Sequence, residues 1–450
     1  MRKRYSFIAL GMAALMVLGG CGGGSEKEES ADTAKKNEKE TVTLRLWGAV
    51  PEEAGPQASC DLFNEQYKDK GIQVEYERFV NDDTGNLKLE TNLLSGTGVD
   101  LYMTYGMDGL TKRAEGGMAL DLTELMEKDS FDLKEYVGEL GDAYKVDGKP
   151  YCLPTKVDKW GIVINKDMFE EAGLEIPTEW TFDEFREVAK KLTHGEGQDK
   201  VYGFFWNTQQ DVSGVLTYFD SHTLGGDPMY KSETESNFTN DVIVKSVELM
   251  NNMMNVDKSS PTHTDSVTQK LSQEGMFLTE KCAMTIGPWM VRSIKDTENY
   301  PHDFVTAFAP YPVVEEGQRN YTQGGYGDFL CINPKSEHID AAWEFAKWYA
   351  TEGMLPVVEG GRVPAFNTYN TDEVTEAFLK GGEDVLDAET TKSILITPAD
   401  NYAAPGITNH SAEIKKIFNE ETEKILIEEQ TPQEGMENAK KRSDEILKES

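Results

Sequence analysis

The sequence TVTLRLW at residues 41–47 opens a strand–helix–strand pattern that decides the fold class. Its apolar and polar residues alternate as they do in a β-strand with one buried face. Residues 59–79, SCDLFNEQYKDKGIQVEYERF, continue with a helical pattern, a turn at Gly71 and a second alternating strand. A strand, a helix and a strand in this order form a βαβ unit. The stretch therefore predicts an α/β fold, with mostly parallel strands in the N-terminal portion.

Further elements have clear start and stop signals. Residues 87–104, LKLETNLLSGTGVDLYMT, predict a helix ended by glycines and followed by a short strand. Thr181 and Glu184 have the spacing of a capping box at the start of a helix. Thr431, followed by proline and then by Glu434, predicts the start of the final helix. These signals extend the α/β pattern along the chain.

The N-terminal segment predicts export and anchoring. Basic residues 2–4 precede an apolar stretch, 7–18, that is too short to span a bilayer and is typical of a signal peptide. The sequence LGGC that ends at Cys21 resembles the lipobox of bacterial lipoproteins, which implies lipid on Cys21. We therefore expect residues 1–20 to be a signal peptide. The protein is then expected on the extracytoplasmic face of the cell membrane, as a lipid-anchored protein.

Residues 21–40 are expected to form a lipidated, flexible tether. Residues 22–40 are rich in glycine, serine, glutamate and lysine and contain no aromatic residue, so they cannot bury enough apolar surface to fold. A flexible chain of this length reaches about 25 Å. The globular part of the protein would therefore move freely beside its anchor.

Length and charge restrict the classes of protein. The chain has 450 residues, and the length beyond residue 40 favours two or more domains. The formal net charge of −35 should repel nucleic acid, so no nucleic acid partner is expected. No internal repeat with a fixed period is evident, and a monomer is expected. We interpret the charge chiefly as a source of solubility.

Cysteine and histidine positions favour neither a metal site nor a cofactor. Cys60, Cys152, Cys282 and Cys331 have no metal-ligand spacing, and the six histidines are isolated from one another. Export would permit disulfides, in any of three connectivities. Three of the cysteines lie among apolar neighbours, where cysteine usually behaves as a small buried hydrophobe. We therefore expect free thiols.

Four segments carry a resemblance to a known family. They are YCLPTKVDKWGIVINKDMFEEAGLEIPTEWTFDEF at 151–185, GPW at 287–289, GGYGDFLCINPKSEHIDAAWEFAKWYATEG at 324–353 and GGRVPAF at 360–366. In this order they resemble the family 1 extracellular solute-binding proteins of carbohydrate ABC transporters, a group that includes the maltodextrin-binding proteins. The resemblance extends over nearly all of the chain from residue 41 to residue 450.

The resemblance implies a fold and a function. Family members have two α/β lobes of the periplasmic-binding-protein type, joined by a hinge of crossing strands. A sugar or oligosaccharide is held in the cleft between the lobes and delivered to the subunits of a membrane ABC permease. Mapped onto this sequence, lobe 1 takes residues 41–151 and 312–350, and lobe 2 takes residues 152–311 and 351–450.

A sugar site requires side chains of two kinds. Sugar hydroxyls pair with carboxylates, amides and guanidinium groups, whereas the C–H faces of the ring pack on flat aromatic rings. The resemblance implies that Trp289 is an aromatic platform and that Asp158, four residues after a proline, is an acidic ligand. Candidate ligand contacts are Trp47, Tyr105, Asp108, Asp158, Trp160, Trp206, Asn207, Gln209, Trp289, Tyr326 and Arg362.

Each candidate has a structural alternative. Trp47 lies at the C-terminal end of the first strand, where ligands approach open α/β sheets, but a tryptophan there can equally be core packing. Asp158 can be a surface charge, Tyr326 part of a hairpin turn, and Arg362 a partner of an acid. Two further tryptophans, Trp343 and Trp348, share the apolar face of one predicted helix and are expected to be core residues.

Two other functions stay open at this point. A secreted glycoside hydrolase needs paired carboxylates, which are so abundant here that they carry no information. The sequence contains no GxSxG or HExxH motif, and a binder needs neither. A protein with the same lobes could also bind a non-sugar solute, such as an oligopeptide or a polyamine. We expect a binding protein and not an enzyme.

Overall fold

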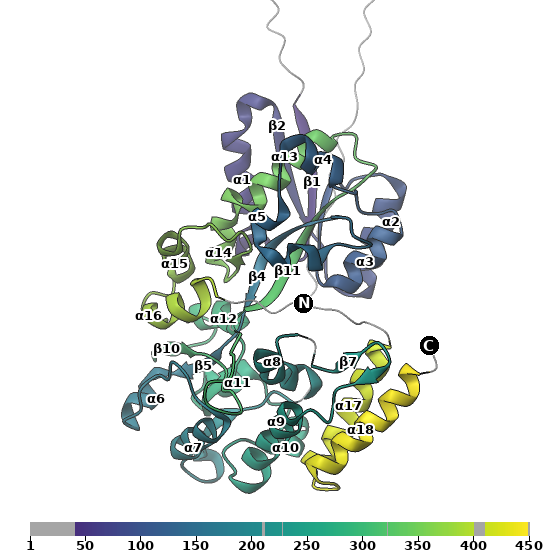
Figure 1. Cartoon of the computed structure of the whole chain (residues 1–450). Helices are drawn as coiled ribbons and strands as arrows, with labels where there is room; N and C mark the ends of the chain where they lie inside the picture. The colour runs from purple at the N-terminus through teal and green to yellow at the C-terminus, as the bar shows by residue number, and fades with distance from the viewer. Residues whose placement is uncertain (1–40, 209–211, 227, 322, 400–409, 449–450) are drawn as a thin grey trace, which may run out of the picture. The chain divides into compact units, whose positions relative to one another are not determined.

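The computed structural model describes residues 41–208, 212–226, 228–321, 323–399 and 410–448 (Figure 1). The expected signal peptide, the tether with its lipidation site at Cys21 and the candidate Gln209 lie outside the described residues.

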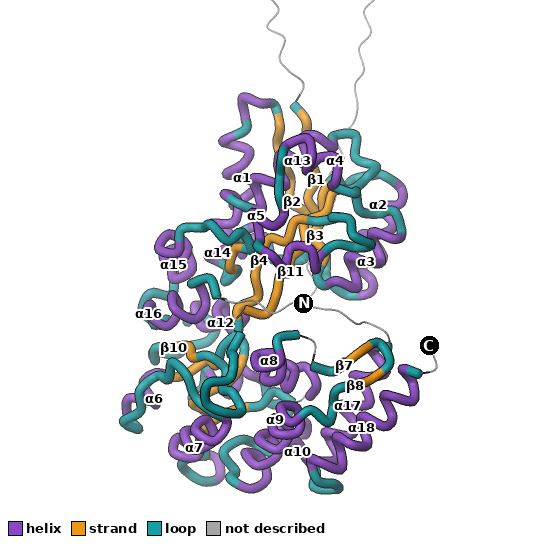
Figure 2. The backbone as a smooth tube through the Cα atoms, in the orientation of Figure 1, coloured by secondary structure: helices purple, strands orange, loops and turns teal. Residues whose placement is uncertain are grey.

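The first sheet has six strands, in the order β12-β4-β11-β3-β1-β2 (Figure 2). The predicted N-terminal βαβ unit is present, and β1 pairs in parallel with both β2 and β3. β11, β4 and β12 join the sheet in antiparallel pairings. The parallel arrangement is therefore confirmed for the N-terminal strands only. The elements of this portion are β1 (Val42–Gly48), α1 (Pro56–Gln66), β2 (Ile72–Arg78), α2 (Asp83–Ser95), β3 (Leu101–Thr104), α3 (Met107–Glu115), α4 (Thr123–Asp129), α5 (Leu133–Val137) and β4 (Leu153–Lys159).

The second sheet has four strands, in the order β10-β5-β9-β6. β5 pairs antiparallel with β10 and β9, and β9 pairs in parallel with β6. Its portion of the chain contains β5 (Ile162–Asn165), α6 (Lys166–Glu171), α7 (Phe182–Leu192), β6 (Tyr202–Phe205), α8 (Val212–Leu224), α9 (Asp241–Asn251), α10 (His263–Thr268), α11 (Gln273–Phe277), β9 (Cys282–Ile286), α12 (Val291–Lys295) and β10 (Thr306–Ala309), with a small separate hairpin of β7 (Tyr230–Ser232) and β8 (Glu235–Ser236).

The chain crosses between the sheets at two clear places. Residues 160–161 alone separate β4 in the first sheet from β5 in the second. The chain returns after β10 and enters the first sheet again at β11. β4 is thus a strand of the first sheet, although the sequence analysis grouped its residues with lobe 2. The elements that follow are β11 (Gln323–Ile332), α13 (Ile339–Ala350), α14 (Leu355–Glu359), β12 (Val363–Pro364), α15 (Thr371–Leu379), α16 (Ala388–Thr390), α17 (Ser411–Leu426) and α18 (Pro432–Leu447).

Side chains on the two faces of the second sheet pack into different apolar clusters. In β5, Val163 joins the cluster that also packs the first sheet, whereas Ile162 and Ile164 join the cluster beneath α7 to α9. This division follows from strand geometry, because successive side chains point to opposite faces. In α13 both tryptophans are buried, with Trp343 bonded to Asp129 and Trp348 to Gln66, which confirms them as core residues.

The predicted helix starts are confirmed. The Thr181 hydroxyl and the Glu184 side chain form a reciprocal capping box at α7, and Thr431 and Glu434 do the same at α18. Trp180, just before α7, packs edge-to-face on Phe185 at a centroid distance of 5.1 Å. This contact is a hydrophobic staple that fixes the angle at which the chain enters the helix.

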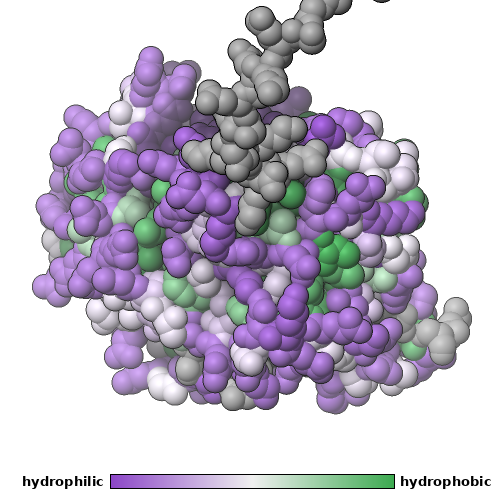
Figure 3. Space-filling view, turned by 90° about the horizontal axis from the view of Figure 1, so that it is seen from above, coloured by the Kyte–Doolittle hydropathy of each residue, from purple (hydrophilic) through white to green (hydrophobic). Residues whose placement is uncertain are grey.

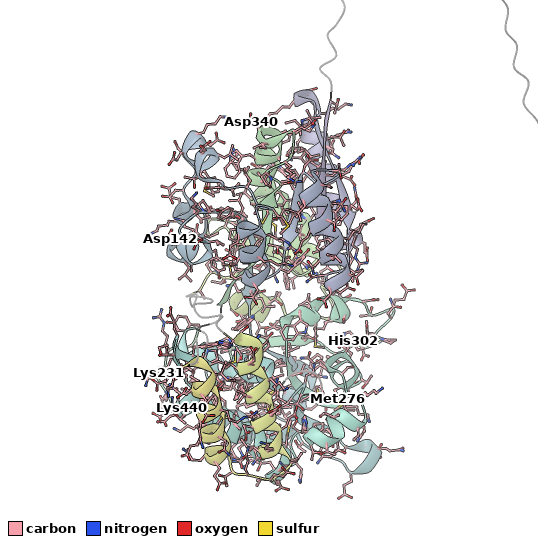
Figure 4. All side chains as sticks on the ribbon, turned by 90° about the vertical axis from the view of Figure 1, so that its right-hand side faces the viewer. Asp142, Lys231, Met276, His302, Asp340 and Lys440 are labelled. Atoms are coloured by element: carbon pink, nitrogen blue, oxygen red, sulfur yellow. The ribbon has the colours of Figure 1, made fainter. Side chains whose placement is uncertain are left out.

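The surface is strongly charged, as the composition predicts. Hydrophilic residues dominate the face drawn in Figure 3. Ion pairs tie some of these charges together: Lys231 and Lys440, labelled in Figure 4, both pair with Glu235, at 3.1 and 2.9 Å. Such exposed pairs contribute little to stability individually.

The four cysteines beyond Cys21 are buried free thiols, which confirms the expectation from their apolar neighbours. Within the described residues, no helix has the length and apolar character needed to cross a membrane. Those residues also contain no group of three or more histidine, cysteine or acidic side chains suited to holding a metal ion.

Candidate functional site

A cavity lies at the end of β4, where the chain passes from the first sheet to the second. β4 and the adjoining crossing residue supply part of its lining, and segments from four other parts of the chain supply the rest. The lining residues are Lys156, Val157, Asp158, Lys159, Trp160, Trp289, Gly361, Arg362, Val363, Phe378 and Leu395. The cavity therefore depends on tertiary structure, because its residues are more than 200 positions apart in the sequence.

Part of the cavity lining is charged: Lys156, Asp158 and Arg362 line it. We call these residues, together with their partner Asp328, the charged wall. The Lys156 ammonium lies 2.8 Å from Asp158 and 3.8 Å from Asp328. Arg362 Nε donates to Asp328 Oδ2 at 2.8 Å. Asp328, which is only 5% exposed, therefore lies between two cations. All four groups belong to the first sheet or to the residue that immediately precedes β12.

Electrostatic interactions favour the charged forms of Lys156, Asp328 and Arg362. Burial on its own would raise the pKa of Asp328, but Lys156 and Arg362 hold it below its usual value. Burial would lower the pKa of Lys156, and the Asp158 and Asp328 carboxylates instead raise it. The pKa of Arg362 is raised by Asp328 against the same effect of burial. These three buried groups are therefore held as fixed charges beside the cavity.

Another part of the lining is aromatic, because Trp160 and Trp289 line the cavity. We call these residues, together with Tyr218, which contacts both rings, the aromatic wall. The Tyr218 ring, from α8, meets Trp160 edge-to-face at 4.8 Å and lies 5.6 Å from Trp289 at an interplanar angle of 42°. Trp289 is 48% exposed, which is unusual for so large an apolar side chain. An exposed indole beside a cavity offers a flat apolar face to a ligand.

A glycine presents Trp289 to the cavity. β9 ends at Ile286, and the next residue, Gly287, has a φ of 103°, which is readily adopted only by glycine. A Cβ atom at Gly287 would lie 2.5 Å from the Trp289 ring, so any other residue would displace the indole. The turn after β9 thus leaves the indole exposed beside the cavity. The role of the indole as a sugar platform stays a prediction.

Lys159, the last residue of β4, is a buried cation. Its side chain donates to the carbonyl oxygen of Thr397 at 2.7 Å, and it forms no ion pair with a carboxylate among the described residues. Burial lowers its pKa to about 7. At neutral pH this amine is therefore close to the midpoint between its charged and neutral forms.

The structure brings some of the predicted residues together. Asp158, Trp160, Trp289 and Arg362 all line the cavity. Tyr105 lies within electrostatic reach of Asp328 and Arg362, and its hydroxyl oxygen accepts a hydrogen bond from the Ala49 N–H at 2.6 Å.

Other predicted residues lie elsewhere. Trp206 is fully buried and packs on Phe219 at 4.5 Å within the core of the second sheet. Trp47 is a buried residue of the first core, and the Lys88 ammonium lies over its ring at 4.6 Å. Tyr326 is also buried, and its hydroxyl donates to the carbonyl of Val137. The three rings are thus packed as core side chains.

Two polar candidates also lie away from the cavity lining. Asp108 is exposed in the first turn of α3. The Asn207 side-chain amide donates to the Gln273 side chain at 3.3 Å. Neither side chain is among the residues that line the cavity.

Sequence reasoning missed several residues of the site. Lys156 could have been found, because it lies two residues before Asp158 and therefore faces the same side of the strand. Asp328 could not have been found in this way, because its φ of 47° interrupts the alternation of side chains between the two faces of β11. The residues that were missed are Lys156, Lys159, Tyr218, Asp328, Phe378 and Leu395.

Comparison with known proteins identifies the family. Residues 49–355 match the model of the bacterial extracellular solute-binding proteins. The chain belongs to this family. The resemblance of the sequence segments to solute-binding proteins of carbohydrate ABC transporters is thereby confirmed.

Individual relatives of this solute-binding protein are named for sugars. A maltotriose-binding protein of Pyrococcus abyssi is 26% identical over 271 residues, which are 58% of this chain and 53% of the relative. A multiple sugar-binding protein of Streptococcus mutans is 27% identical over 330 residues, 71% of this chain and 73% of the relative. The chain thus spans about half of the first relative and nearly three quarters of the second.

Solved structures share the fold. A sugar transporter from Rhizobium etli in an open conformation has a TM-score of 0.72 at 22% identity, covering 91% of this chain and 99% of its own. A cyclic α-maltosyl-1,6-maltose binding protein from Arthrobacter globiformis has a TM-score of 0.68 at 20% identity, covering 91% and 100%. These similarities confirm the α/β fold with two lobes that the sequence predicts.

Proposed function

We propose that this solute-binding protein captures a saccharide in the cavity and delivers it to the permease of an ABC importer. The observation that carries the proposal is that one cavity is lined both by the indoles of Trp160 and Trp289 and by charged side chains such as Asp158 and Arg362. Trp289 and Trp160 would cover the C–H faces of a sugar ring, while Asp158 and Arg362 would bond its hydroxyls. The names of the relatives support the same class of ligand.

A screen of saccharides tests this proposal. The purified protein is melted with and without a panel of mono- and oligosaccharides, and those that raise the melting temperature are titrated by calorimetry. We expect at least one saccharide to stabilise the protein without being converted, since a ligand that binds only the folded state must stabilise it. Amino acids and short peptides serve as controls. Stabilisation by peptides alone would refute the sugar assignment.

The alternatives have less support from the residues of the cavity. A glycoside hydrolase needs a carboxylic acid whose pKa is raised, whereas the pKa of the buried Asp328 is lowered. A polyamine is a poor match for a cavity that already contains Lys156, Lys159 and Arg362. Chromatography of saccharides incubated with the protein tests for hydrolysis directly, since products would indicate an enzyme.

The two lobes are proposed to close over the ligand. We propose that lobe 1 takes residues 41–159 and 312–350 and that lobe 2 takes residues 160–311 and 351–450; the first boundary differs from the one expected from the sequence because β4 pairs with β11 in the first sheet. The crossing at residues 160–161 would be one element of the hinge. Small-angle scattering should show a smaller radius of gyration with a bound saccharide than without it. An unchanged radius would contradict closure and leave binding intact.

Lipid attachment at Cys21 is proposed from the sequence. Processing at LGGC would leave a chain that starts at Cys21 and carries acyl groups, which together hold a protein at a membrane more firmly than one acyl chain. Intact-mass measurement of protein from bacterial membranes tests this. A soluble chain that lacks acyl groups would contradict it.

A further inference from the structure

Two of the four buried free thiols lie opposite each other on neighbouring strands. β4 and β11 run antiparallel and side by side in the first sheet (Figure 1), and their pairing brings Leu153 opposite Leu330. In an antiparallel pair, one step backward along one strand matches one step forward along the other. Cys152, which immediately precedes β4, is therefore opposite Cys331 of β11. Side chains placed in this way point to the same face of the sheet.

Pro154 decides which kind of pair the two cysteines form. Opposite residues of antiparallel strands alternate between pairs that exchange two backbone hydrogen bonds and pairs that exchange none. Pro154 faces Phe329 and has no N–H to donate, so this pair exchanges none. The next pair along is hydrogen-bonded, and the pair of Cys152 and Cys331 is again one without hydrogen bonds. In such pairs the Cα atoms are about 4.5 Å apart and the side chains approach closely.

This spacing fits a disulfide, because disulfides join cysteines whose Cα atoms are about 4.4–6.8 Å apart. Burial and, after it, the neighbouring Cys331 thiolate raise the pKa of Cys152, so the two sulfur atoms are within electrostatic reach of each other. Both side chains are buried, at 2% and 0% exposed. The other two described cysteines are placed differently: Cys60 lies in α1, and Cys282 of β9 faces Tyr202 of β6.

We propose that Cys152 and Cys331 form a disulfide bond when the protein folds in the presence of a disulfide oxidant. The chain belongs to an extracellular family, and disulfides form and persist outside the cytoplasm. The bond would join the strands that carry Lys156 and Asp328 of the charged wall, both of which belong to the first sheet. It therefore stabilises that sheet without tying it to the second, and it is independent of the ligand that the cavity takes.

The reaction is a two-electron oxidation by thiol–disulfide exchange. One cysteine thiolate attacks a sulfur atom of the oxidant, for example oxidised glutathione, and a mixed disulfide forms as one glutathione thiolate leaves. The second cysteine thiolate attacks the protein sulfur of the mixed disulfide, so that the Cys152–Cys331 bond forms and a second glutathione thiolate leaves. The two leaving thiolates take up the two protons that the cysteines lost. Glutathione disulfide is thereby reduced to two thiols, and the two cysteines are oxidised.

Burial restricts when this reaction can occur. The thiolate is the reactive form of cysteine, and burial raises the pKa of both thiols, that of Cys331 to about 12. The folded protein should therefore react slowly, because its sulfur atoms are neither accessible nor ionised. Oxidation is expected during folding, before the sheet and the helices that cover it enclose the two side chains.

Peptide mapping after oxidative refolding tests the proposal. The full chain is unfolded with a reductant, refolded in reduced and oxidised glutathione, alkylated in denaturant and digested with trypsin. We expect the peptide of residues 146–156, which contains Cys152, to be linked to the peptide of residues 320–335, which contains Cys331. The other cysteines of the folded part of the chain should be alkylated. Treatment with a reductant before alkylation is the control and should release the two peptides.

Thermal melting measures the effect on stability. A disulfide that closes a long loop stabilises a protein mainly by restricting the unfolded chain. The oxidised protein should therefore melt a few degrees above the same protein in a reductant. Cys331→Ala should abolish this difference. Cys282→Ala, which also removes a completely buried thiol, is the matched control and should retain it.

Three results would overturn the proposal. The first is recovery of both peptides unlinked and alkylated after refolding with oxidised glutathione. The second is linkage of Cys152 or Cys331 to Cys60 or Cys282 in place of each other. The third is a difference in melting temperature that persists in Cys331→Ala. Peptide mapping requires no substitution, so it decides the proposal even where a variant fails to fold, and the saccharide screen decides the proposed function separately.

Discussion

The two walls of the cavity are built in opposite ways. The side chains of the charged wall form ion pairs with one another. Asp328 is buried between Lys156 and Arg362, and these ion pairs fix all three side chains. The aromatic wall leaves nearly half of Trp289 exposed. Fixed charges need no rearrangement to orient a ligand, whereas the exposed indole gains burial only when a ligand arrives. We infer that the first wall stabilises the fold and the second contributes mainly to binding.

The largest expected effect is a loss of stability in Asp328→Asn. Removing this carboxylate leaves Lys156 and Arg362 without their shared buried partner, which should lower the free energy of unfolding by about 3–5 kcal/mol. Urea unfolding measures the change. Asp340→Asn, which breaks the exposed pair with Lys128, is the matched control and should have almost no effect. Equal effects in the two variants would show that the charged wall does not stabilise the fold.

The second prediction separates the aromatic wall from the core. Trp289→Ala should weaken saccharide binding by about 1–3 kcal/mol, roughly 10- to 100-fold, with little loss of stability, because the indole is half exposed without ligand. Trp206→Ala is the control: it removes a fully buried ring and should cost about 3–5 kcal/mol of unfolding free energy. Calorimetric titration and thermal melting distinguish the two. Normal binding by a destabilised Trp289→Ala would make this indole a core residue.

The smallest expected effect concerns pH and Lys159. The pKa of this buried lysine is lowered to about 7, while an unfolded lysine has a pKa of about 10.4. Between these pH values the unfolded chain binds a proton at this lysine that the folded protein does not bind. The contribution of Lys159 to the free energy of unfolding should therefore increase as the pH rises, by at most about 1.4 kcal/mol per pH unit. Below about pH 7 both states are protonated, and the destabilisation is fully present.

Replacing the amine tests this sign. Lys159→Met should show a smaller rise in unfolding free energy than the unchanged protein between about pH 7 and about pH 9. Lys295, whose pKa burial lowers to about 8, is present in both proteins and cancels in the difference. Identical pH profiles would show that Lys159 keeps its proton in the folded protein.

Much of the fold was predictable because it depends on local signals. The strand at 42–48, the capping boxes at Thr181 and Thr431, and the buried helical face of Trp343 and Trp348 each follow from patterns within a few residues. The antiparallel strands of the first sheet were not predicted. β11 pairs with β3 and β4 only after the chain has passed through the second sheet and returned, and no local pattern specifies such a pairing.

The sequence by itself determined the fold class, the family resemblance and the helix starts at Thr181 and Thr431, because these depend on short stretches of chain. Tertiary structure alone decided which aromatic residues face the cavity. Trp206 and Trp289 each follow a strand, yet the rings of Phe204 and Phe219 enclose only Trp206. The pairing of Arg362 with Asp328 likewise joins residues 34 positions apart. Burial and ion pairing depend on what distant segments bring into contact, and no single stretch of sequence contains that information.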